Sequence, residues 1–184
     1  TQNQSSAASD VYKRQDLMQD ENKTPEFIVW AQRDKNGAPL QRVQIIKGWI
    51  DTNSGRPKEK VYDVACSDGM NVNPITNRCP DNGARVNISD CSITNNVGSS
   101  ELKTLWKDPD FVSSNKYFYY VRVLENPTCR WSTWDAIKRG HKPREDLHET
   151  IQERAWTSPI WYTPYESDVE VIPLGGTIRL RNID

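Results

Sequence analysis

The sequence predicts a mainly β protein, with a β-sandwich-like (Ig-like) domain, one short helix and a long loop anchored by disulfides. Several short runs rich in β-branched and aromatic residues alternate with turn signals such as Asn36-Gly37. Only one short stretch has helical character, and the strand–helix alternation typical of a parallel sheet is not present. The four cysteines make an even count, and three of them lie in one polar segment.

The predicted strands follow one another through the first two thirds of the chain. In the second strand, Val43, Ile45 and Trp49 share one face by the two-residue period of a strand. The fifth strand, KYFYYVRVLE, carries the strongest signal because it is dense in aromatic and β-branched residues. The expected strands span residues 27–31, 41–51, 60–66, 101–106 and 116–125.

A short helix is expected over residues 133–139. Ser132 and Asp135 resemble a capping box with Asp in the place of Glu, and Gly140 is a natural stop. The sequence then predicts one long last strand over residues 151–162, in which Pro159 indicates an edge position.

These elements divide the chain into three parts. Residues 1–25 read as a disordered leader, residues 26–165 as the β-sandwich-like domain, and residues 166–184 as a tail or hairpin around Gly175-Gly176. The stretch SAASDVYKRQ is similar to adaptor-derived sequence at broken ends of metagenomic gene models. We therefore interpret residues 1–15 as non-native, with an ordinary disordered linker as the alternative.

Cys66, Cys79, Cys91 and Cys129 are expected to form two disulfides. A zinc site would need closely spaced cysteine or histidine pairs, and the sequence contains no CxxC. Three pairings are compatible with four cysteines, and the sequence does not choose among them. Disulfides would anchor the polar loop over residues 67–100 and would place the protein in the bacterial periplasm or outside the cell.

Charge and hydropathy exclude two classes of partner. The formal net charge is −1 and the basic residues are scattered, so no nucleic-acid partner is expected. No apolar run approaches the roughly 18 residues that a membrane span requires, so no membrane span is expected. The sequence does not predict an oligomeric state.

Few residues have the pattern of an active site. Asp108 and Asp110 flank a proline and could present two carboxylates, but Asp-Pro-Asp is also a good turn. His141 and His148 are the only histidines. The acidic residues beside His148 could complete a metal site, but a solvated charged loop is the preferred interpretation. Most of the seven tryptophans are expected to be buried, with Trp131 as the best exception.

Several strings resemble one bacterial protein family. They are VWAQRDKNGAPLQRVQIIKGW (29–49), EKVYDVACSDG (59–69), LWKDPDF (105–111), FYYVRVLENPTCRWSTWDA (118–136) and IQERAWTSPIWYTP (151–164). Together they are similar to the C-terminal region of family 3604 of the domains of unknown function. The resemblance covers most of residues 27–164, and the last two strings are the most specific.

This resemblance implies a larger exported hydrolase. Members of the family look like PHP-type metallohydrolases (the polymerase and histidinol phosphatase superfamily), with a D-x-H-x-H-like motif for divalent metals in their N-terminal part. No HxH string occurs in this chain. We therefore expect no cofactor or metal in this part of the protein and a divalent metal in the missing N-terminal half. We also expect that this part is a non-catalytic accessory domain that is inactive alone.

The expected partner is that N-terminal metal domain, and five residues are candidates to face a shared cleft. They are Arg130, Trp131 and Asp135, followed by Glu153 and Arg154. An arginine could bind an anionic substrate through two hydrogen bonds. Structural ion pairs, Arg130 with Asp135 and Glu153 with Arg154, are the alternative.

Two other functions stay open from the residues. One is a secreted carbohydrate- or partner-binding β-sandwich module that uses exposed tryptophans. The other is a free-standing enzyme that uses Asp108, Asp110 and His148.

Overall fold

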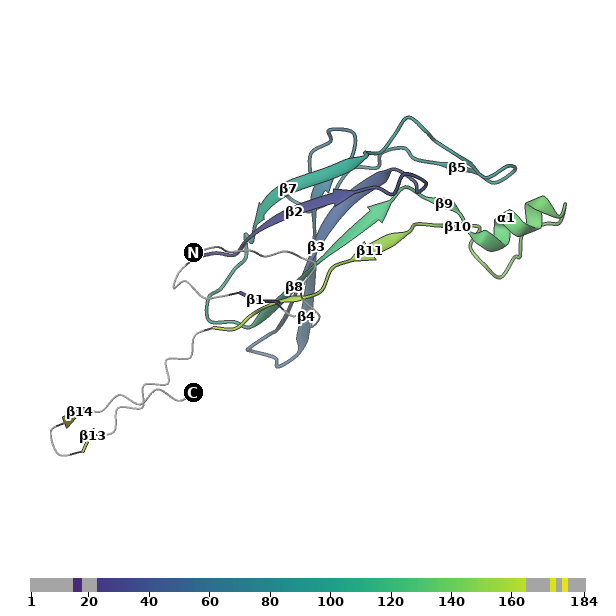
Figure 1. The fold of residues 1–184 in the computed structure, drawn as a ribbon. Helices are drawn as coiled ribbons and strands as arrows, with labels where there is room; N and C mark the ends of the chain where they lie inside the picture. Colours follow the sequence, from purple (N-terminus) through teal and green to yellow (C-terminus); the bar gives the residue numbers. More distant parts are fainter. Residues whose placement is uncertain (1–14, 18–22, 165–172, 175–176, 179–184) are drawn as a thin grey trace.

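The computed structural model describes residues 15–17, 23–164, 173–174 and 177–178. It confirms a mainly β, β-sandwich-like fold with two layers (Figure 1). The main sheet has the strand order β1-β12-β8-β3-β4, and β11 also pairs with β8. Its strands are β1 (Gln15–Asp16), β3 (Leu40–Ile50), β4 (Pro57–Cys66), β8 (Tyr117–Glu125), β11 (Arg154–Trp156) and β12 (Ile160–Tyr162). The second layer is the antiparallel pair β2 (Glu26–Gln32) and β7 (Glu101–Lys107).

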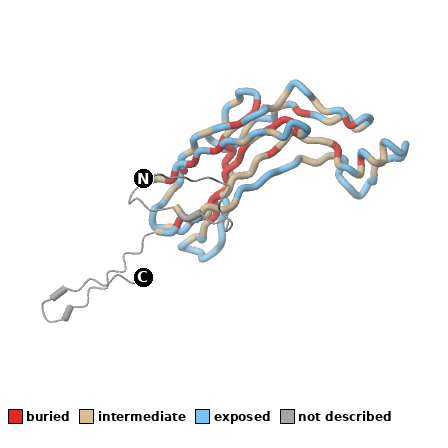
Figure 2. The backbone as a smooth tube through the Cα atoms, in the orientation of Figure 1, coloured by how far each residue is buried: buried red, intermediate tan, exposed pale blue. Residues whose placement is uncertain are grey.

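The hydrophobic core lies between these two layers and follows the alternation of the strands. Val43 and Ile45 of β3 point into it, as the two-residue period predicts, and they meet Phe27 and Val29 of β2. Figure 2 shows the buried residues running along the middle of the sandwich. The other buried members of this cluster are Leu40, Tyr62, Val64, Leu102, Tyr117, Tyr119 and Tyr162.

Both expected disulfides are present. Cys66 bonds to Cys79, and Cys91 bonds to Cys129. The loop between β4 and β7 contains only the short hairpin of β5 (Val86–Asn87) and β6 (Ser92–Ile93). The two disulfides tie this loop to the end of β4 and to the segment just before the helix, so a long polar connection keeps a defined path.

The helix α1 spans Trp131–Lys138 and projects from one end of the sandwich (Figure 1). It begins two residues earlier than predicted, and the predicted capping box is wrong. Arg130 occupies the N-cap position without a side-chain hydrogen bond, and Ser132 lies inside the helix. The start is determined by β9 (Thr128–Cys129), because this strand pairs with β10 (Thr150–Ile151) and leads directly into the first turn.

The predicted long strand over residues 151–162 is broken into three pieces. β10 pairs with β9, whereas β11 and β12 both pair with β8. Between β11 and β12, Thr157 exchanges backbone and side-chain hydrogen bonds with Val121 instead of continuing the ladder. Pro159 lies in this break, and proline has no N–H to donate to a ladder.

Near the C-terminus, β13 (Pro173–Leu174) and β14 (Thr177–Ile178) pair antiparallel on either side of the predicted Gly175-Gly176 turn. Those two glycines, most of the predicted tail and nearly all of the predicted leader lie outside the described residues. No helix in the described part of the chain is long and apolar enough to cross a membrane.

Candidate functional site

A hollow of about 470 Å³ lies beside the start of α1, where β9, β10 and β11 come together. It combines cationic, acidic and aromatic side chains. Three of the five candidate cleft residues, Arg130, Glu153 and Arg154, line it. The other lining residues are His148, Thr150, Ile151, Gln152 and Trp156.

Arg130 is held at this hollow by the local backbone. Cys129 is covalently tied to Cys91 and pairs with Thr150 across the β9–β10 ladder. The backbone N–H of Arg130 donates to the carbonyl of Glu149, and its Nε donates to the carbonyl of His148 at 3.1 Å. These bonds use one of the donors of the guanidinium. Its two terminal amino groups form no hydrogen bond that the described residues provide.

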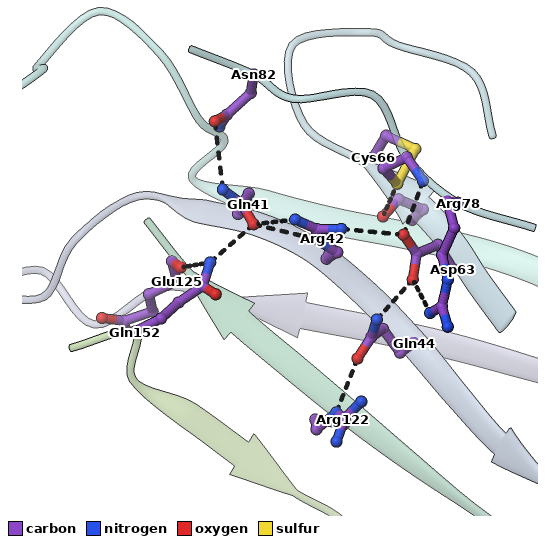
Figure 3. Close-up of polar contacts among 12 residues, drawn as sticks. Gln41, Arg42, Gln44, Asp63, Cys66, Arg78, Asn82, Arg122, Glu125 and Gln152 are labelled. Atoms are coloured by element: carbon purple, nitrogen blue, oxygen red, sulfur yellow. Dashed lines mark hydrogen bonds and ion pairs between the residues drawn. A yellow bond between two sulfur atoms is a disulfide. The ribbon is translucent and has the colours of Figure 1, made fainter. Parts of the chain in front are cut away.

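Glu153 and Arg154 reach the hollow from the start of β11. Gln152 holds this segment against the main sheet, because its Nε2 donates to Gln41 Oε1 at 2.7 Å and to the Glu125 carbonyl at 2.9 Å (Figure 3). Glu153 immediately precedes β11 and Arg154 is its first residue. Both side chains line the hollow, and they form no ion pair with each other within the described chain.

The ion-pair alternative is thus wrong for both predicted pairs. Asp135 does not contact Arg130. Its Oδ1 lies 3.2 Å from Nε of Arg139, one helical turn later. Asp135 and Trp131 do not line the hollow, because both lie on α1 beyond its edge. The unpaired guanidinium of Arg154 is the feature that most favours a ligand.

A second hollow of about 310 Å³ lies between the layers at the same end and shares Glu153 and Arg154 with the first. Trp30 of β2 and Glu125 of β8 also line it. Burial raises the pKa of Glu125, the backbone N–H of Ala38 opposes this rise, and the carboxylate of Glu153 adds to it. The two hollows thus share Arg154, but Glu125 adds a second carboxylate to the second hollow, whereas Arg130 adds a second guanidinium to the first.

The Asp108 carboxylate is buried in the core, whereas the Asp110 carboxylate is half exposed at its edge. Asp108 Oδ2 accepts from Lys47 Nζ at 2.6 Å and from the Tyr119 hydroxyl at 2.7 Å. Asp110 accepts from Lys60 and from the Tyr62 hydroxyl. Tyr119 faces Lys47 across the sheet, whereas Arg154 faces Leu124, five positions further along β8. That is about 17 Å of strand, so the structure separates Asp108 from the hollow that contains His148.

The residues around His148 do not form the metal site that the sequence offered as an alternative. Asp146 is paired with Arg144 at 2.6 Å on the surface. Within the described residues, no group of three His, Cys, Asp or Glu side chains is placed to hold a metal ion. The part of the chain that the structure describes therefore does not fit a divalent metal. Cys129 beside Arg130 is not a reactive thiol, because it is disulfide-bonded.

The expectation that most tryptophans are buried is wrong. Trp30, Trp131, Trp134, Trp156 and Trp161 are all exposed, from 37% to 77%. Trp30, Trp156 and Trp161 lie on strands, and their side chains have no further layer over them, whereas Trp131 and Trp134 lie on the projecting helix α1. A single sequence does not reveal either arrangement. Sequence reasoning also missed His148 and Trp156 as lining residues. The alternation Arg154-Ala155-Trp156 could have placed Trp156 on the face of Arg154.

Comparison with known proteins gives one match. Residues 3–164 match the family described as "Protein of unknown function (DUF3604)". No curated protein and no solved structure matches the chain significantly. Since the match covers most of the sequence and includes the residues of the hollow, the chain belongs to this DUF3604 family.

Proposed function

We propose that this β-sandwich is a non-catalytic accessory domain of a larger exported PHP-like metal-dependent hydrolase. In this proposal another segment of the same protein supplies the divalent metal, and the sandwich docks against it. The two disulfides are compatible with a secreted or periplasmic protein, which supports the export part of the proposal.

The observation that carries the proposal is an uncovered apolar patch on the second layer, formed by Ile28, Trp30 and Leu105. Ile28 and Leu105 are direct cross-strand partners, and their exposed fractions are 85% and 65%. Trp30 is 65% exposed. A continuous apolar patch at the surface is typical of a contact with another domain.

The docking patch and the candidate site are connected. Trp30 belongs to the patch and also lines the second hollow, which shares Glu153 and Arg154 with the first. The edge of a domain that covers the patch would therefore lie beside Glu153 and Arg154. In this arrangement Arg130 and Arg154 bind an anionic group of the substrate, since guanidinium groups bind carboxylates and phosphates through paired hydrogen bonds.

The test uses an intact family member that contains both the metal motif and this sandwich. Glutamate is introduced at the positions of Ile28 and Leu105, and alanine at the position of Trp131 serves as a control on an exposed aromatic residue outside the patch. We expect the patch variant to lose hydrolase activity and to become sensitive to protease between the two domains, while its metal content stays unchanged. Wild-type activity and protease resistance in the patch variant would reject the docking proposal.

A second candidate function is a secreted carbohydrate- or partner-binding module. The five exposed tryptophans favour it, because aromatic rings at a surface provide apolar faces against which sugar rings pack. This function needs no metal domain and can be tested on the chain itself.

A further inference from the structure

The face of the main sheet that points away from β2 and β7 carries a row of aromatic and basic side chains; we call it the outer face. Register and alternation place its members on the same side of the sheet. By register it comprises Gln44, Ile46, Gly48, Phe118, Tyr120, Arg122, Leu124, Arg154, Trp156 and Trp161, of which Gln44, Ile46 and Leu124 are buried.

One half of the outer face is aromatic. Phe118 and Tyr120 lie side by side with nearly parallel rings, 6.4 Å apart and 6° between planes. Trp161 contacts Phe118 at 5.5 Å between ring centroids. Gly48 faces Phe118 across the ladder, and a Cβ at this glycine would lie only 2.2 Å from the Phe118 ring. Because Gly48 has no side chain, the Phe118 ring packs directly against the backbone of β3.

The other half of the outer face is basic. Arg122 is the cross-strand partner of the 60%-exposed Trp156, and it donates from Nε to Gln44 Oε1 at 2.7 Å. Gln44 in turn donates to Asp63 (Figure 3).

The one carboxylate in this network is already neutralised. Asp63 is shared by Arg42 at 3.3 Å and Arg78 at 3.5 Å, and it also accepts from the Cys79 backbone N–H. This carboxylate therefore does not neutralise Arg122 or Arg154, and this half of the outer face carries a net positive charge. Arg122 forms no ion pair with the described residues, and neither does Arg154.

The two halves form one continuous track. Trp161 pairs with Phe118 and Arg154 pairs with Leu124, six positions apart along β8. Six residues of strand span about 20 Å, which is long for a single small molecule and suits a chain of several units. The basic end of the track opens into the hollow beside Arg130, since Arg154 and Trp156 line both.

We propose that the outer face binds an acidic oligosaccharide, whose sugar rings pack on the aromatic half and whose carboxylates pair with Arg154, Arg122 and Arg130. The apolar C–H faces of sugar rings match the rings of Trp156, Tyr120 and Phe118, and the carboxylates match the unpaired guanidinium groups. This inference rests on the carbohydrate-binding function proposed above and names its ligand class. The two disulfides are compatible with an oxidising compartment, which favours a glycan over a nucleic acid as the anionic chain.

The experiment is calorimetric titration of the full chain with a galacturonic acid hexamer, a neutral glucose hexamer and a single-stranded oligonucleotide. The variants are Trp156→Ala and Arg154→Gln, with Trp131→Ala as the matched control, because Trp131 is 77% exposed but lies on α1. Trp156 and Arg154 are exposed, so neither substitution is expected to disturb the fold. Thermal unfolding of each variant checks this.

We expect the acidic hexamer to bind, and Trp156→Ala and Arg154→Gln each to weaken it about tenfold, the effect of losing one good contact. Trp131→Ala should bind like the wild type, and added salt should weaken binding. If only the neutral hexamer binds, carbohydrate binding stands and the acidic class is wrong. If neither hexamer binds, if the oligonucleotide binds more tightly, or if Trp131→Ala has the same effect, the proposed site is rejected. The docking test on an intact family member is independent of these results.

Discussion

Lys47 Nζ lies 2.6 Å from Asp108 Oδ2 inside the core, where the two side chains are 2% and 0% exposed. The ammonium group also donates to the Asp110 carbonyl at 2.9 Å and lies 4.2 Å from the centroid of the Tyr117 ring. Every polar group of this site thus has a partner, as buried charges require. The pair connects the main sheet to the turn after β7 and determines where that turn lies.

The first prediction follows from this pair. Asp108→Asn removes the charge and leaves Lys47 buried without a counter-ion, so we expect a loss of about 3–5 kcal/mol in the free energy of unfolding. Asp110→Asn should cost much less, because the Asp110 side chain is 50% exposed. Urea unfolding of both variants checks the difference. The double variant Lys47→Met/Asp108→Asn should lose less than the sum of its two single changes, and simple additivity would contradict the coupling.

The second prediction ranks the two disulfides. The Cys91–Cys129 bond closes a separation of 38 residues and the Cys66–Cys79 bond one of 13. Loop-closure entropy then gives about 4 kcal/mol for the longer and about 3 kcal/mol for the shorter bond. We expect Cys91→Ser/Cys129→Ser to lower the thermal midpoint more than Cys66→Ser/Cys79→Ser does. It should also free Arg130 from the hollow, which hydrogen exchange at α1 would report. The opposite ranking would show that the loop is held by packing instead.

The third prediction concerns the contact between Gly48 and Phe118. Gly48→Ala forces the Phe118 ring off the sheet, because the new Cβ would lie 2.2 Å from it. We expect a loss of about 1–3 kcal/mol in stability, the usual cost of overpacking. Phe118→Leu in the same chain should restore part of that loss, since the smaller side chain leaves room. If Gly48→Ala unfolds at the wild-type urea concentration, the close approach does not limit stability.

The fourth prediction is a pH dependence at the second hollow. Folding raises the pKa of Glu125, so its contribution to stability is present below its ordinary pKa and is lost as the pH rises through the folded pKa. At neutral pH the ionised carboxylate therefore destabilises the fold. Glu125→Gln should raise the urea midpoint at pH 7, and its advantage should shrink near pH 4.

Glu153→Gln provides the matched test of the fourth prediction. It removes the neighbouring charge that adds to the raised pKa of Glu125. The Glu125 side-chain carboxyl, followed by NMR during an acid titration, should then titrate at a lower pH than in the wild type. An unchanged titration would show that the Glu153 carboxylate does not contribute to the raised pKa of Glu125.

Most strands were predictable from the sequence, because alternation along a strand depends only on neighbours two residues apart. Phe27 and Val29, or Val43 and Ile45, show which face is buried without reference to the rest of the chain. The helix start was not predictable in this way. Ser132 has the local pattern of a cap, but pairing of β9 with β10 placed Arg130 at that position instead.

The sequence by itself determined the β-rich class, the strand faces and the need for two disulfides. Only the tertiary structure decided which cysteines pair, where the strand over residues 151–162 breaks, and which tryptophans stay uncovered. It also decided that Arg130 and Arg154 share one hollow while Asp135 turns to Arg139. These outcomes depend on contacts between residues far apart in the chain and on which sheet faces a second layer covers. Local sequence patterns show neither of these.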